Sequence, residues 1–128
     1  MTPQSAKAKG RRLQQEVRDA LRSIGSAYGL EDGDIESRSM GAAGTDIILS
    51  PAAKRVFGRY AIECKNVEHL NVSGIFWKFR SHVLAGSEAA DTVAILVHDK
   101  NRTEEPLVTL RLTDFLAWLE RDADRRLS

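Results

Sequence analysis

Three residues near the middle of the chain have the types and spacing of a metal-dependent hydrolytic site. Asp46 lies at the head of the apolar run TDIILS, and Glu63 and Lys65 stand two positions apart at the end of the run RYAIECK. Alternate side chains of a strand share one face, so we expect Glu63 and Lys65 to project together, away from Ile62 and Cys64. The pattern predicts an acid and a base on one face of a strand.

The preceding strand is expected to bring a second carboxylate to this pair. TDIILS alternates poorly and is apolar enough for a strand that is buried on both faces. Ser50-Pro51 should end that strand, and residues 51–55 should form a turn that makes the two strands antiparallel neighbours. Asp46 would then lie beside Glu63.

Two converging carboxylates with a nearby lysine suit Mg²⁺, which prefers carboxylate, water and phosphate oxygens. We expect Asp46 and Glu63 to bind the metal, and Lys65 to orient the attacking water or to stabilise developing charge. The implied chemistry is phosphodiester hydrolysis. The alternative is that Asp46 only begins a strand and that Glu63 and Lys65 form a solvent-facing charge pair, because an isolated E-x-K triplet is common.

Asp46 followed by Glu63-Cys64-Lys65 resembles the core of the PD-(D/E)xK nuclease superfamily, with Thr45 in place of the proline of that family. Within the superfamily, the chain is similar to archaeal Holliday junction resolvases and to their phage and bacterial relatives. The resemblance covers most of the chain, from about residue 9 to residue 98.

Three further segments carry this resemblance. Lys9-Gly10 with Glu16 resembles the K-G-x(5)-E opening of the resolvases, and residues 37–41, SRSMG, resemble the R-S-x-G segment before the metal aspartate. Residues 69–72, HLNV, correspond to a short segment that follows the catalytic strand. The resemblance implies that Glu16 completes or tunes the metal shell, and the backbone carbonyl of Cys64 is a further candidate ligand.

The resemblance also implies a fold and an activity. We expect an α/β, restriction-endonuclease-like fold with a central mixed β-sheet flanked by helices, in one nuclease domain over residues 1–128. The expected activity is that of a Mg²⁺-dependent, structure-specific DNA endonuclease that resolves Holliday junctions, with Mn²⁺ able to substitute. The alternatives are another restriction or repair nuclease of the superfamily, or a DNA-binding module of the same fold without turnover.

Charge and composition limit the protein classes that remain. The net charge is only +1, so contact with branched or duplex DNA would depend on where the basic residues lie. The basic groups are also compatible with solvated faces. The candidate DNA-binding residues are Lys9, Arg11, Arg12, Arg38, Ser39 and His69.

The cysteine content and the apolar runs are those of an ordinary globular domain. The one cysteine, Cys64, excludes an internal disulfide, and we interpret it as a core residue. No apolar run approaches the ~20 residues that a membrane span needs, and no signal-peptide pattern opens the chain. We therefore expect no membrane partner and a cytoplasmic location in a bacterial, archaeal or phage-infected cell.

Periodicity predicts the element order α-β-β-β-α-β-β-α. An apolar stripe predicts a first helix over about 5–24, and a second helix should be capped by Ser73. The apolar run at 91–98 suits a buried parallel strand, a further strand should span 107–112, and Thr113 should cap the last helix.

A homodimer is expected as the working unit. A four-way junction must be cut in two opposed strands, whereas one domain of this size with one metal site offers one cut. A C₂ dimer would place two such sites at a fixed spacing. Several large apolar residues on the predicted helices could supply the interface: Phe76, Trp77, Phe79, Phe115 and Trp118.

Overall fold

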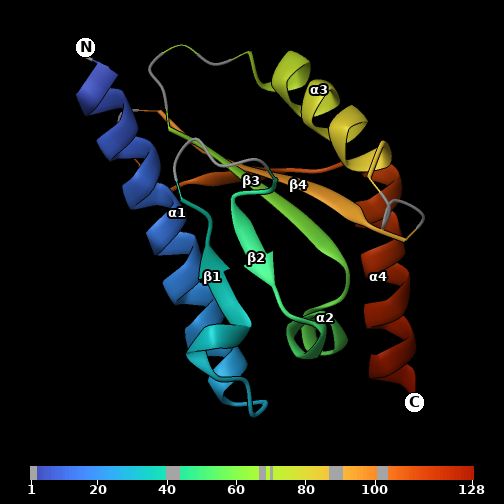
Figure 1. Cartoon of the computed structure of the whole chain (residues 1–128). Coiled ribbons are helices and arrows are strands. Elements are labelled where there is room, and N and C mark those ends of the chain that lie inside the picture. Colours follow the sequence, from blue (N-terminus) through green and yellow to red (C-terminus); the bar gives the residue numbers. More distant parts are fainter. Residues whose placement is uncertain (1–2, 40–43, 67–68, 70, 87–90, 101–103) are drawn as a thin grey trace.

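The computed structural model describes residues 3–39, 44–66, 69, 71–86, 91–100 and 104–128 (Figure 1). In this part of the chain, four α-helices and two β-sheets form a mixed α/β fold. The elements are α1 (Pro3–Ser26), β1 (Ile35–Ser37), β2 (Ile47–Leu49), α2 (Pro51–Phe57), β3 (Tyr60–Asn66), α3 (Val72–Leu84), β4 (Val93–Asp99), β5 (Leu107–Thr109) and α4 (Leu112–Leu127), with a 3₁₀ turn at Asp32–Asp34.

Residues 51–55 form part of a helix, α2, and not the expected turn. Ser50 caps this helix, because its Oγ accepts a hydrogen bond from the Ala53 N–H at 3.1 Å. Pro51 occupies the first turn, where a missing N–H leaves no helical hydrogen bond unmade. Gly58 ends the helix with φ of +103°. The expected element order is therefore wrong, since this helix separates the second and third strands.

The strands form two sheets, whereas one central sheet was expected. β1 and β2 pair antiparallel, with Ile35 opposite Leu49. In the second sheet β3 and β4 pair in parallel and β4 and β5 pair antiparallel. The parallel position of β4 confirms the prediction from its apolar run, and the antiparallel ladder expected between the second and third strands is absent from the strands assigned here. The restriction-endonuclease-like arrangement stays a prediction.

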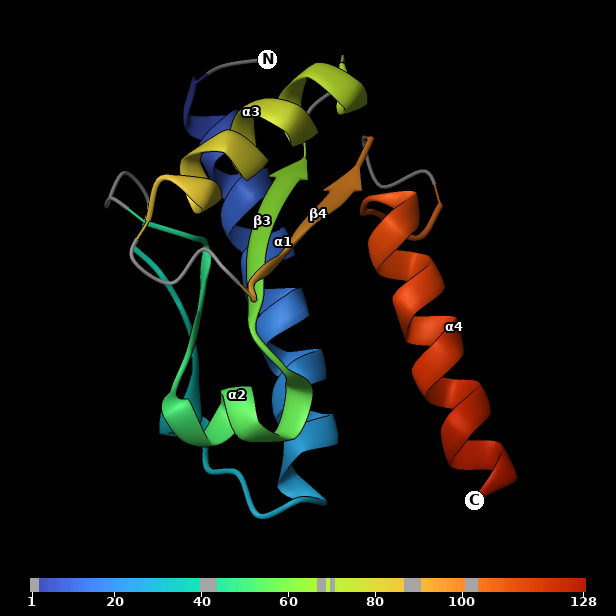
Figure 2. The same ribbon diagram turned by 90° about the vertical axis from the view of Figure 1, so that its right-hand side faces the viewer.

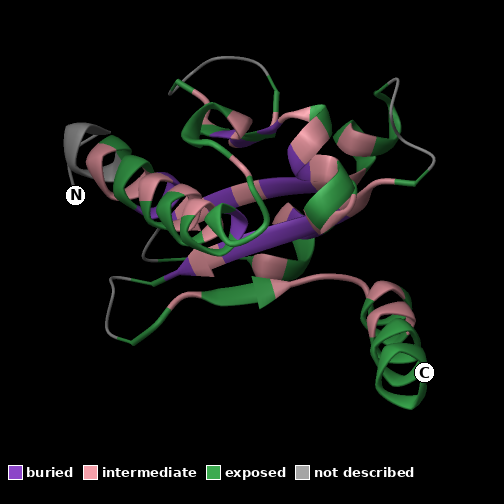
Figure 3. Cartoon of the chain, turned by 90° about the horizontal axis from the view of Figure 1, so that it is seen from below, coloured by how far each residue is buried: buried purple, intermediate pink, exposed green. Residues whose placement is uncertain are grey.

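Two hydrophobic clusters cover the two faces of the β3-β4 pair. One lies under α1 and includes alternate residues of both strands, and its members are Leu13, Ile35, Ile47, Leu49, Ala53, Ile62, Cys64, Ile95 and Val97. The other lies under α3 and consists of Ala61, Phe76, Phe79, Ala94 and Leu96. Each fully buried Leu or Ile contributes roughly 1.5–3 kcal/mol through removal of apolar surface from water. In Figure 3 the buried colour is concentrated on these two central strands.

Several predicted boundaries and burial patterns need correction. β2 is buried on one face only, because Ile47 and Leu49 are buried and Ile48 is exposed. Asn71, and not Ser73, caps α3, since its Oδ1 accepts the Gly74 N–H at 3.1 Å.

The ends of three more elements differ from the expectation. The last helix begins at Leu112 with Arg111 as its cap position, two residues before the predicted cap Thr113. β5 is three residues long, shorter than the strand that was predicted over 107–112. α1 starts at Pro3, so Lys9-Gly10 lies within the helix and does not open it.

The last helix lies to one side of the β3-β4 pair (Figure 2). α4 has no buried residue, and Leu112, Phe115, Leu116 and Leu119 are all exposed. Trp118 is the residue of α4 that packs against the core under α1. No helix in the described ranges is both long and apolar enough to cross a membrane.

Candidate functional site

Asp46 lies where the two sheets meet, and three hydrogen bonds hold it there. Its backbone N–H donates to the Ile62 carbonyl at 3.1 Å, and its own carbonyl accepts the Arg38 N–H at 2.7 Å. Its side-chain Oδ2 accepts the Cys64 N–H at 2.8 Å. The carboxylate is thereby fixed against the edge of β3 that does not pair with β4, so the predicted approach of Asp46 to this strand is confirmed.

Glu63 projects from β3 and meets the Asp46 side chain. Burial, a hydrogen bond to Asp46 and the negative charge of Asp46 together raise the pKa of Glu63 to about 8, against a smaller opposing effect of the Lys65 charge. A hydrogen bond between two carboxyl groups needs a shared proton, because two carboxylates in contact repel each other. A cation between them would remove the same repulsion.

Lys65 lines the same cavity as Glu63, on the α3 face of the strand. The cavity has a volume of about 580 Å³, and α3 contributes Lys78, Phe79 and His82 to its wall. Ile62 and Cys64 belong to the opposite core, as the strand alternation predicts. The expected acid and base therefore share one face and one cavity.

The thiol of Cys64 is a core group. Burial, followed by the negative charges of Asp46 and Glu63, raises the pKa of the Cys64 thiol far above its usual range. The thiol is therefore neutral, and it packs beneath α1, which confirms its interpretation as a core residue. The role of its backbone carbonyl as a metal ligand stays a prediction.

Glu16 is not brought into this cavity. It is exposed on α1, the helix that packs against the Ile62 and Cys64 face of β3, whereas Glu63 and Lys65 project toward α3. Glu16 does not line the cavity that contains Glu63 and Lys65. Its participation in the metal shell stays a prediction.

The candidate DNA-binding residues fall into two separate groups. Lys9, Arg11 and Arg12 lie on α1, where Arg11 and Arg12 are exposed and the Lys9 carbonyl accepts the Asn66 side-chain N–H at 3.4 Å. Arg38 follows β1, and its backbone N–H donates to the Asp46 backbone carbonyl as described above.

The two remaining DNA-binding candidates, Ser39 and His69, are exposed. Met40, Gly41 and Leu70, from the segments that resemble the resolvases, lie outside the described residues.

The residues present suit a hard divalent cation with few protein ligands. No group of three or more His, Cys, Asp or Glu side chains is arranged to hold a metal ion among the residues described. Mg²⁺ keeps several waters and commonly takes one or two carboxylates together with substrate phosphate oxygens. Asp46 and Glu63 supply the two carboxylates that such a site needs. A bound cation would also relieve the repulsion between them, which favours binding.

Two side chains with titratable nitrogen atoms in the cavity wall were not predicted as site residues. Lys78 and His82 line the cavity from α3, and both are exposed. They stand four positions apart, which places them on the same side of a helix. That spacing is visible in the sequence, but it does not show which strand the helix would face.

Comparison of the chain with protein-family models, with curated proteins and with solved structures returned no match. The function must therefore be inferred from the side chains and their geometry.

Proposed function

We propose that this protein is a Mg²⁺-dependent DNA endonuclease that acts on branched DNA in the manner of a Holliday junction resolvase. The observation that carries the proposal is the contact between the Asp46 and Glu63 side chains, with Lys65 in the same cavity as Glu63. The order and spacing of these residues also resemble the PD-(D/E)xK core. We include in the proposal that this chain belongs to that superfamily.

Asp46 and Glu63 would hold the cation through their carboxylate oxygens. When bound, Mg²⁺ supplies neutralisation of a phosphodiester oxygen and polarisation of the attacking water. Oδ2 of Asp46 is already engaged by the Cys64 N–H, so Oδ1 is the atom of Asp46 best placed to ligate. The backbone bonds of Asp46 keep this carboxylate oriented before substrate arrives, which lowers the cost of assembling the site.

Lys65 would act on the substrate side of the site. Lys65 lines the cavity that contains Glu63, which would bring its side chain near the expected position of the scissile phosphate. There it can orient the water or stabilise the charge that develops on the phosphate oxygens. Lys78, from α3, is suited to contact the next part of the same strand, because it lines the opposite wall of the cavity.

A homodimer formed through α4 would provide the two cuts that a junction needs. The apolar face of α4 is exposed, and the neighbouring edge strand β5 also exposes Leu107 and Val108. The polar positions of α4 carry both acidic and basic residues, which suits pairing with a second copy about a two-fold axis. Leu116→Lys should convert a dimer to a monomer in sedimentation, whereas Leu127→Lys, at the end of the same helix, should not. A monomeric wild-type protein would contradict the dimer.

The function is tested by cleavage of a synthetic four-way junction and of a linear duplex with the same sequence, each in Mg²⁺ and in chelator. The expected result is metal-dependent cleavage of the junction, lost in Asp46→Asn and Glu63→Gln. Glu36→Gln is the matched control, because Glu36 is an exposed carboxylate on β1 outside the cavity.

Three results would change the proposal. Equal cleavage of junction and duplex would indicate another nuclease of the same chemistry. Binding without cleavage in any metal would leave only a DNA-binding module. Wild-type rates in Asp46→Asn would remove the proposed site.

A further inference from the structure

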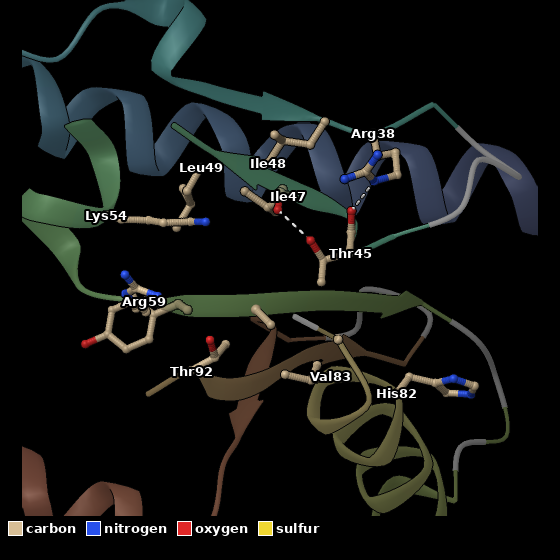
Figure 4. Close-up of a pocket in the computed structure, with 13 residues that line it drawn as sticks. Arg38, Thr45, Ile47, Ile48, Leu49, Lys54, Arg59, His82, Val83 and Thr92 are labelled. Carbon is tan, nitrogen blue, oxygen red and sulfur yellow. Dashed lines mark hydrogen bonds between the residues drawn. The ribbon is translucent and has the colours of Figure 1, made fainter. Parts of the chain in front are cut away.

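A second cavity, of about 340 Å³, lies beside the carboxylate cavity and is lined by basic residues. Arg38, Lys54 and Arg59 come from three different segments of the chain and all line this cavity (Figure 4). None of the residues that line it is Asp or Glu. Three cations around one cavity that no carboxylate lines create a positive potential that favours the binding of an anion.

The structure holds the Arg38 guanidinium group in a defined position. Its Nε–H donates to the Thr45 carbonyl at 2.7 Å, and this bond is drawn in Figure 4. Gly44 makes the position accessible, because a Cβ at this residue would lie 2.6 Å from Arg38 Cζ. The Nη groups carry further N–H donors in a planar arrangement that matches two phosphate oxygens.

The other two cations are placed by rigid elements. Lys54 is on α2, whose start is capped by Ser50, and Figure 4 shows its side chain extending across the cavity. Arg59 immediately precedes β3, and its carbonyl accepts the Val93 N–H at 2.8 Å, which ties this position to β4. Because each backbone is anchored, the ordering that remains when a ligand binds is that of the two side chains.

The basic cavity continues into the carboxylate cavity. Thr45, His82 and Val83 line both of them. A ligand that extends from one cavity to the other would therefore pass along Thr45, with the candidate metal ligand Glu63 at one end and the cations at the other. A single small anion would occupy only one of these places, whereas a chain of linked phosphates would occupy both.

We propose that the cavity lined by Arg38, Lys54 and Arg59 binds a backbone phosphate of the DNA strand that is cleaved, adjacent to the scissile phosphate. This inference rests on the proposed function and adds the binding position that sets the register of the strand. The negative charge of the phosphate in the basic cavity must be neutralised by protein side chains. The charge of the scissile phosphate would instead be neutralised by the Mg²⁺ ion held by Asp46 and Glu63. Arg38, Lys54 and Arg59 thus act in binding and not in the chemical step.

The test is the salt dependence of binding to a labelled four-way junction, measured by anisotropy in chelator so that no cleavage occurs. Lys54→Met and Arg59→Met keep the apolar stem and remove the charge. Each lost phosphate contact on duplex arms should reduce the slope of log K against log salt by about 0.9, which at 0.1 M salt is about an eightfold loss of affinity.

Arg55→Met is the matched control. Arg55 adjoins Lys54 in the sequence, but it does not line the cavity, and its charge acts on the Asp34 carboxylate, whose pKa it helps to lower after the Ser50 and Glu31 hydrogen bonds. Its slope should equal that of wild type. Equal slopes in all the variants, or an equal decrease in Arg55→Met, would overturn the proposal.

Two further measurements distinguish the alternatives. A nucleoside 5′-monophosphate that displaced the junction as well as unlabelled DNA at equal phosphate concentration would place a free nucleotide in the cavity and overturn the proposal. Cleavage in Mg²⁺ is measured on the same preparations. Cleavage with unchanged slopes removes this inference alone. Reduced slopes without cleavage by any preparation would show a phosphate site in this cavity but remove the nuclease function, and with it the adjacent scissile phosphate.

Discussion

Replacement of Asp46 by Ala and by Asn should separate the structural role of this side chain from its chemical role. In both variants the negative charge is lost, so both should lose cleavage. The two differ in one respect, since Asn keeps a side-chain oxygen that can accept the Cys64 N–H and Ala does not.

The expected stability difference follows from that single hydrogen bond. Cys64 is 6% exposed, so in Asp46→Ala its N–H would lose its partner in a place that water reaches poorly. An unpaired buried donor costs about 1–3 kcal/mol. For a domain of this size, the loss corresponds to a decrease in Tm of roughly 4–12 °C. Asp46→Asn should remain within about 0.5 kcal/mol of wild type, because its amide can also donate to Glu63.

Urea unfolding in chelator and single-turnover cleavage in Mg²⁺ measure the two effects independently. Both variants should cleave at least about 100-fold more slowly than wild type, since loss of groups around a metal already costs 10- to 100-fold. Equal destabilisation of Asn and Ala variants would refute the structural reasoning. Cleavage by Asp46→Asn at more than a tenth of the wild-type rate would refute its role as a ligand.

Three other predictions follow from the structure. Gly44→Ala places a Cβ at a residue with φ of +113° and against Arg38, so urea unfolding should show a loss of about 1–2 kcal/mol, and DNA affinity should fall with it. Unchanged affinity would contradict the positioning of Arg38. Lys65→Ala should reduce the single-turnover rate at saturating DNA by about 100-fold or more with little change in binding, and a wild-type rate would reassign Lys65 to binding. Burial lowers the pKa of His98, against the raising effect of Asp99, so the unfolded chain binds more protons below the ordinary pKa near 6.5. The free energy of unfolding should therefore rise as the pH rises toward that ordinary pKa, and His98→Gln should remove that part of the slope.

The local pattern of the sequence determined the parts of this protein that depend on alternation and burial. The two-residue period of β3 is enough to separate Glu63 and Lys65 from Cys64, because strand geometry allows no other arrangement. The apolar run of β4 likewise predicts its buried, parallel place in the sheet.

Short elements were less predictable, because the same few residues are compatible with more than one local structure. Ser50-Pro51 is compatible with a turn and also with a helix start, and burial of Ala53 favours the helix in the folded chain. The same holds for β2, whose three residues are too few to show an alternation that distinguishes one buried face from two.

The cavities were decided by the tertiary structure alone. The sequence places Asp46 and Glu63 on strands that could adjoin, but the bonds from Asp46 to Ile62 and Cys64 exist only after two sheets have met. Arg38, Lys54 and Arg59 are likewise basic positions without a shared period or motif. They line one cavity because the segments that carry them pack around it, and such long-range convergence depends on packing rather than on any local preference of the chain.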